Sequence, residues 1–80
     1  MKKSELLSYL TAGREIEFSY DEKMYSITHI VESNVQKISF CEFYHEDETF
    51  DSVESFVESA MIGDERLTDI ISLITDVVVY

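Results

Sequence analysis

The chain has 80 residues, a formal net charge of −11, 45% apolar residues, one cysteine and no proline. A chain of this length forms one domain, 1–80, and its single cysteine excludes an internal disulfide, which favours a reducing cytoplasm. The charge excludes direct binding to nucleic acid or anionic lipid, because both are themselves negative.

The negative charge is concentrated in the second half of the sequence. Residues 42–80 carry eleven acids against Arg66 alone, whereas residues 1–41 carry six acids against five bases. A half this negative attracts basic protein surfaces, so we expect the partner to be another protein with a basic surface.

The first expected elements are a short helix and a β-hairpin. Residues 4–12 predict a helix with Ser4 as its N-cap and Gly13 just beyond its end. Alternating apolar residues then predict strands at 14–20 and 24–31, joined by a polar turn at 21–23. The helix stripe is Leu6, Leu7 and Leu10, and one face of each strand carries Ile16, Phe18 and Tyr20, then Tyr25, Ile27, His29 and Val31.

A third strand is expected at 37–44, after a turn around Asn34. Its alternation changes phase at Cys41, which is consistent with a β-bulge there. Residues 46–49 are predicted to form an acidic loop.

Two helices and a strand are expected after this loop. Asp51, paired with Glu54, predicts the N-cap of a helix that Gly63 ends, and a second helix is expected from 64 or 65 to 74. Their apolar stripes are Val53, Phe56, Val57, Ala60, Leu67, Ile70, Ile71 and Ile74. The β-branched residues at 77–80 favour a strand, with a continuing helix as the alternative.

These elements predict an α+β fold in the order α-β-β-β-α-α-β. An antiparallel sheet of three to four strands would carry its helices on one face.

The acids of the predicted helix at 51–62 are the candidate binding surface. Asp51, Glu54 and Glu58 lie opposite the apolar stripe, with axial steps of roughly 4.5 and 6 Å. Phosphates along one DNA strand rise by about 3.4 Å, a distance of the same order. Glu65 and Asp69 would extend this surface, which is either a nucleic-acid mimic or a solvated helix face.

No metal, cofactor or catalytic motif is expected, so we do not expect an enzyme. The acidic run at 46–51 has consecutive acids and no glycine, unlike a calcium-binding EF-hand loop. Cys41, His45 and His29 are too few and too irregularly spaced for a structural zinc site.

We expect a cytoplasmic protein that is neither secreted nor inserted in a membrane. Glu5 and Ser8 interrupt any apolar core of a signal peptide. The apolar stretch at 70–80 is too short to span a bilayer and contains Asp76.

Two groups of residues resemble small uncharacterised proteins from phages and prophages of Gram-positive bacteria. The first is Gly13-x-x-Ile16-Glu17-Phe18-x-Tyr20 followed by Lys23-x-Tyr25-Ser26-Ile27. The second is Phe50-Asp51-Ser52 and Ile62-Gly63-Asp64-x-x-Leu67-x-x-Ile70-Ile71. The resemblance implies a similar small fold but no assigned activity, and Asp21-Glu22 stands where a turn with glycine is expected.

We therefore expect a non-enzymatic protein-binding module, which in its narrower form mimics nucleic acid and occupies a basic protein. The alternative is a self-associating structural or regulatory module. In it, the exposed strand at 77–80 would pair with a second copy to form a homodimer.

Overall fold

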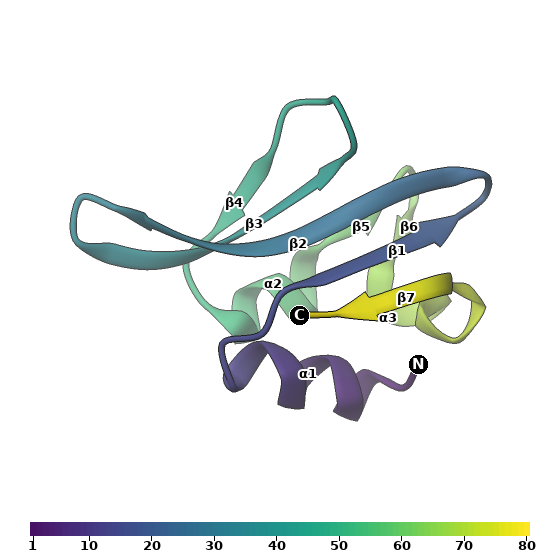
Figure 1. The fold of residues 1–80 in the computed structure, drawn as a ribbon, viewed down its shortest axis with the longest axis horizontal. Helices are drawn as coiled ribbons and strands as arrows, with labels where there is room; N and C mark the ends of the chain where they lie inside the picture. Colours follow the sequence, from purple (N-terminus) through teal and green to yellow (C-terminus); the bar gives the residue numbers. More distant parts are fainter.

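A computed structural model of all 80 residues shows an α+β fold in which one sheet packs against three helices (Figure 1). The chain order confirms the expected succession of elements and adds short strands to it. The elements are α1 (Lys3–Thr11), β1 (Ile16–Tyr20), β2 (Lys23–Glu32), β3 (Val35–Glu42), β4 (Glu48–Phe50), α2 (Val53–Ser59), β5 (Met61–Ile62), β6 (Glu65–Arg66), α3 (Leu67–Ile70), the 3₁₀-helix η1 (Ile71–Leu73) and β7 (Thr75–Val79).

The main sheet has five antiparallel strands in the order β4-β3-β2-β1-β7. The C-terminal segment is therefore a strand, and the alternative of a continuing helix is wrong. Strand β4 was not predicted and makes the sheet five-stranded. Because it includes residues 48 and 49, the acidic loop predicted at 46–49 is shorter than expected. Only Phe50 of β4 is apolar and buried, which is too little alternation to predict a strand.

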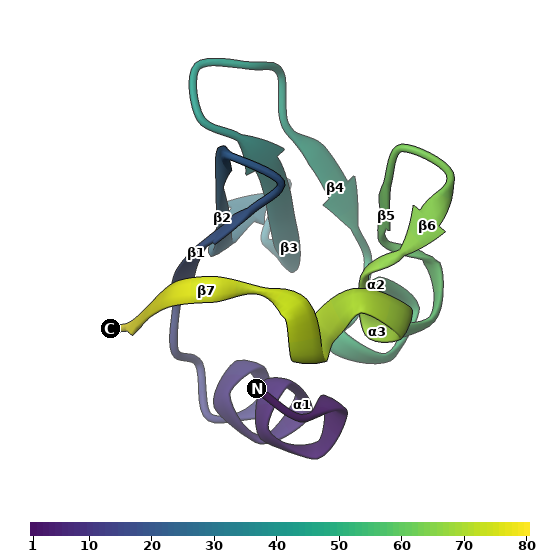
Figure 2. The same cartoon turned by 90° about the vertical axis from the view of Figure 1, so that its right-hand side faces the viewer.

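The core lies between one face of the sheet and the helices. Of the strand residues predicted to face inward, Ile16, Phe18, Tyr25 and Ile27 are buried and Tyr20 is half-buried. The prediction is wrong for Val31, which is 69% exposed near the end of β2, and for Leu7 of the first helix stripe, which is 38% exposed. The other apolar residues of the helix stripes pack against the sheet. The opposite sheet face is mixed: it carries polar residues such as Ser26, Thr28 and Lys37 together with Met24 and Ile30. Figure 2 shows the helices on a single side of the sheet. No helix is long and apolar enough to cross a membrane.

Both predicted N-caps are displaced. Helix α1 starts one residue earlier than Ser4, and the Lys2 backbone N–H donates to Glu5 Oε1 at 2.9 Å. Helix α2 is capped by Ser52 rather than Asp51, since Ser52 Oγ accepts from the Ser55 N–H at 3.0 Å. At α2, Asp51 and Ser52 are adjacent and of similar capping ability, which makes the choice between them hard to predict from sequence.

The segment after α2 departs most from prediction. The helix ends at Ser59, with Ala60 as its C-cap, instead of continuing to Gly63, and residues 61–66 form a small hairpin, β5–β6. The Leu67 N–H donates to the Ala60 carbonyl at 2.9 Å and closes the base of this hairpin. The predicted third helix is therefore limited to α3 and η1, although its stripe of Leu67, Ile70, Ile71 and Ile74 is buried as expected.

The bulge expected at Cys41 is absent. Strands β2 and β3 pair in unbroken register from Tyr25–Glu42 to Glu32–Val35, and β3 ends at Glu42 rather than at 44. The irregularity lies instead between β1 and β7, where the register shifts between Glu17 and Ser19 and Asp76 has a φ of 53°.

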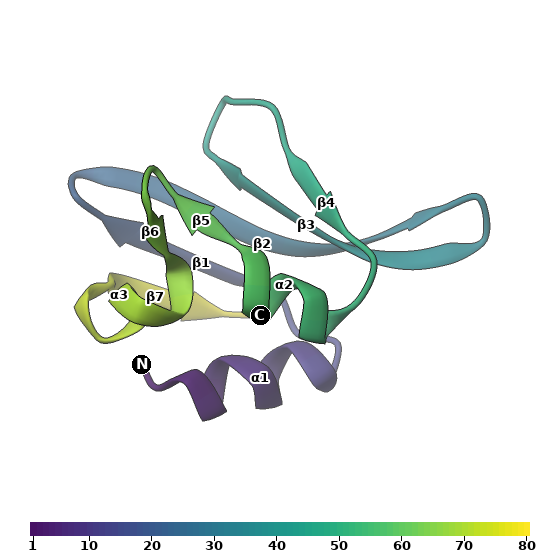
Figure 3. The ribbon, with the colours of Figure 1, turned by 180° about the vertical axis from the view of Figure 1, so that it is seen from behind.

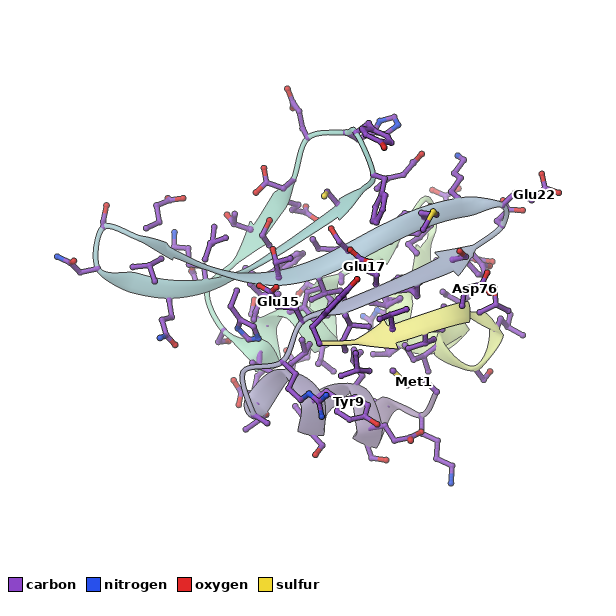
Figure 4. The ribbon with its side chains drawn as sticks, viewed as in Figure 1. Met1, Tyr9, Glu15, Glu17, Glu22 and Asp76 are labelled. Carbon is purple, nitrogen blue, oxygen red and sulfur yellow. The ribbon has the colours of Figure 1, made fainter.

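The β1–β2 turn places two non-glycine residues in the left-handed region. Asp21 and Glu22 have φ values of 51° and 64°, and Tyr20 pairs with Lys23 on either side of them. A two-residue hairpin loop with both φ values positive favours asparagine and glycine. Glu22 lies at the tip of the hairpin and points away from the molecule (Figure 4).

We expect Glu22→Gly to raise the free energy of unfolding by about 0.5–1 kcal/mol, because glycine adopts the left-handed conformation without steric cost. Urea denaturation measures the change. Glu22→Ala is the matched control, since it removes the same carboxylate but keeps a Cβ in the left-handed region. Equal stabilisation by both variants would show that charge, not backbone conformation, is responsible.

Candidate functional site

The five acids predicted to form one surface are divided between separate elements. All five are exposed: Glu54 and Glu58 lie on α2, Asp51 precedes it, Glu65 belongs to β6, and Asp69 belongs to α3. Asp51 Oδ1 lies 3.6 Å from Lys37 Nζ, so a positive charge lies beside the first acid of the row formed by Asp51, Glu54 and Glu58. Only Glu65 lines the main cleft of the molecule.

This cleft has a volume of about 840 Å³. It opens between the ends of three hairpins: β1–β2, β3–β4 and β5–β6. Figure 2 shows β5 and β6 standing apart from β1, β2 and β3 on the helix side of the sheet. Its lining residues are Tyr20, Asp21, Lys23, Tyr25, Phe40, Cys41, Glu42, His45, Glu46, Glu48, Met61, Ile62, Gly63, Asp64, Glu65 and Leu73.

Negative charge dominates the lining. Six carboxylates line the cleft, and Lys23 is the only lysine or arginine among the lining residues. His45 Nε2 lies 3.2 Å from Glu42 Oε2, so a protonated imidazole would neutralise one of them. A concave surface lined by one sign of charge concentrates its field, which attracts cationic groups.

The base of the cleft is aromatic. Tyr25 and Phe40 are buried and stack with ring centroids 5.9 Å apart. Burial raises the pKa of Tyr25, and the nearby carboxylate of Glu42 raises it further. The acids thus surround an apolar base rather than a polar one.

A hydrogen bond joins the two sides of the cleft. The Tyr20 hydroxyl, on β1, donates to Glu65 Oε2, on β6, at 2.7 Å. Sharing the phenol proton with a carboxylate raises the pKa of Tyr20 above its ordinary value of 10.0. Glu65 therefore contacts the sheet and does not extend the acidic row of α2.

The residues considered for metal binding are not assembled into a site. No group of three or more histidine, cysteine, aspartate or glutamate residues is placed to hold a metal ion. His29 Nε2 lies 3.0 Å from the Arg14 carbonyl oxygen, and Cys41 Sγ lies 3.5 Å from Ser26 Oγ.

Sequence reasoning did not identify most of the cleft. Asp21, Glu42, Glu46, Glu48 and Asp64 come from three separate hairpins, and only their shared charge was visible in the sequence. The acidic run at 46–48 was the one sign of this site in the sequence. It lines a cleft only because the β5–β6 hairpin, which was not predicted, forms the other side.

Comparison with protein-family models, with curated proteins and with solved structures finds no match for this chain. The function is therefore inferred from the geometry and chemistry of the cleft alone.

The hydrogen bond from Tyr20 to Glu65 and the burial of Tyr25 predict a loss of stability at alkaline pH. A phenol whose pKa is raised on folding contributes stability that is complete below 10.0 and is lost as the pH rises through the folded-state pKa. The free energy of unfolding should therefore fall above about pH 10. Urea denaturation over a pH series measures this slope.

Tyr20→Phe should make that decline shallower, because it removes one of the perturbed phenols. Tyr44→Phe, which alters a fully exposed tyrosine outside the cleft, is the matched control and should keep the original slope. An unchanged slope in Tyr20→Phe would contradict the assigned hydrogen bond.

Proposed function

We propose that this protein is a small non-enzymatic binding module of the cytoplasm whose acidic cleft receives a basic segment of another protein. The observation that carries the proposal is the arrangement of six carboxylates and one lysine around a base of buried aromatic rings. Lysine and arginine side chains satisfy both parts of such a site. Their charged ends meet carboxylates while their aliphatic stems cover apolar surface.

The charge of the whole molecule supports the same class of partner. A net charge of −11 repels nucleic acid and anionic lipid and accelerates encounter with a basic protein. Such encounter rates fall as salt is added, because the Debye length shortens from about 10 Å at 0.1 M to about 3 Å at 1 M.

The narrower hypothesis of nucleic-acid mimicry places the contact on α2 instead. Asp51, Glu54 and Glu58 are exposed, which is what a phosphate-like row requires. The proximity of Lys37 to Asp51 weakens the field of that row at one end. The cleft has more carboxylates, and they line a concave surface, so we favour it over the helix as the binding site.

Two triple variants of equal charge distinguish these surfaces. Glu42→Gln, Glu46→Gln and Glu48→Gln together remove three carboxylates of the cleft, and Asp51→Asn, Glu54→Gln and Glu58→Gln remove three along α2. The probe is an oligolysine peptide titrated by calorimetry. At about 0.2–1 kcal/mol for each exposed charge pair, we expect the cleft variant to bind roughly tenfold more weakly.

The α2 variant should lose much less affinity, since its three carboxylates lie outside the cleft. A greater loss in the α2 variant would favour the mimic, and the absence of oligolysine binding to the unmodified protein would overturn the proposed function.

One observation favours the alternative of self-association. Strand β7 is an edge of the sheet, and Val78 and Tyr80 are exposed there. The shifted register and the left-handed Asp76 interrupt this edge, and two copies of charge −11 repel. We therefore expect a monomer by sedimentation velocity at high micromolar concentration and moderate salt. A dimer that Val78→Lys abolishes would support the alternative instead.

A further inference from the structure

The two walls of the cleft differ in chemistry. The wall formed by β5 and η1 carries the apolar residues Met61, Ile62 and Leu73, and Met61 and Leu73 are 43% and 61% exposed. Figure 3, seen from behind, shows β5 and β6 in front of β1 and β2. Exposed apolar side chains beside a cleft are typical of a surface that becomes covered on binding.

The facing wall is formed by the end of β3, the β3–β4 loop and β4. It contributes Glu42, Glu46 and Glu48, with His45 as the only basic side chain among them. One side of a bound segment would therefore meet only carboxylates and His45. Its other side would meet methionine, isoleucine and leucine, next to Asp64 and Glu65 of the β5–β6 hairpin.

We propose that the occupant is an amphipathic basic helix of a partner protein, bound with its lysine or arginine side toward Glu42, Glu46 and Glu48. Its apolar side packs against Met61, Ile62 and Leu73. This inference rests on the proposed function and specifies its partner. Two turns of an α-helix, which is about 10 Å across, are enough to present both faces to the two walls.

A second copy of the chain does not fit this description. Its most basic segment is the start of α1, with Lys2 and Lys3, but the apolar residues Leu6 and Leu10 of that helix are buried in its own core. Two copies would also each bring a net charge of −11. A partner of opposite charge is therefore favoured.

Two peptides of about 15 residues, a length at which isolated helices begin to form, test the arrangement of faces. Both contain the same numbers of lysine, leucine and alanine. The segregated peptide places its leucines at helical spacing on one face, and the scrambled peptide distributes them around the helix. Calorimetry with the full-length protein should show at least about tenfold tighter binding of the segregated peptide, with a more negative heat-capacity change.

Variants of the apolar wall test the same inference from the protein side. Leu73→Ser should weaken binding of the segregated peptide about fivefold and weaken oligolysine binding much less, because the leucines of the segregated peptide are the side chains that pack against this wall. Val31→Ser is the matched control: Val31 is 69% exposed and lies outside the cleft, so it should change neither affinity.

The outcomes separate this inference from the function it rests on. If the segregated and scrambled peptides bind equally well and oligolysine also binds, the proposal of an amphipathic helix is wrong. The proposed function, binding of a basic segment, would still hold. Binding of neither peptide nor oligolysine overturns both. Loss of segregated-peptide binding in Val31→Ser to the same degree as in Leu73→Ser also overturns the assignment to this wall.

Discussion

The edge-on packing of Phe56 against Phe40 and Phe50 holds α2 beneath β3 and β4. Phe56 is 0% exposed, and its ring centroid lies 5.5 Å from that of Phe40 and 5.3 Å from that of Phe50. Edge-to-face aromatic pairs contribute about 0.5–1.5 kcal/mol beyond the burial of their surface. Because β5 begins two residues after α2 ends, this packing also determines where the β5–β6 hairpin leaves the core. The position of the apolar wall therefore depends on Phe56.

The cleft combines features that do not favour folding on their own. Carboxylates gathered around one cavity repel one another, and exposed methionine and leucine side chains gain nothing from remaining in water. The fold offsets these costs locally through the Tyr20–Glu65 hydrogen bond and the contact between His45 and Glu42. A basic, partly apolar ligand would neutralise these carboxylates and cover these apolar side chains. Binding would therefore lower the free energy of this surface.

Local patterns in the sequence predicted the helices, the central strands and the C-terminal strand, because each depends on periodicity within a few residues. They did not predict β4, whose single buried residue is Phe50, or the β5–β6 hairpin, whose strands have two residues each. Glu54 and Glu58 were correctly placed on an exposed helix face, but Glu65 was not, since it lies on β6. The cleft itself escaped prediction because its carboxylates come from three hairpins that only the tertiary fold brings together.

Amide chemical shifts of the ¹⁵N-labelled protein, recorded during titration with the segregated amphipathic basic peptide, locate the binding surface most directly. If the cleft is the site, the largest shift changes fall in residues 42–48 and 61–65, and the amides of Glu54 and Glu58 on α2 change little. Changes centred on residues 53–59, or no saturable changes at all, would contradict a binding site in the acidic cleft.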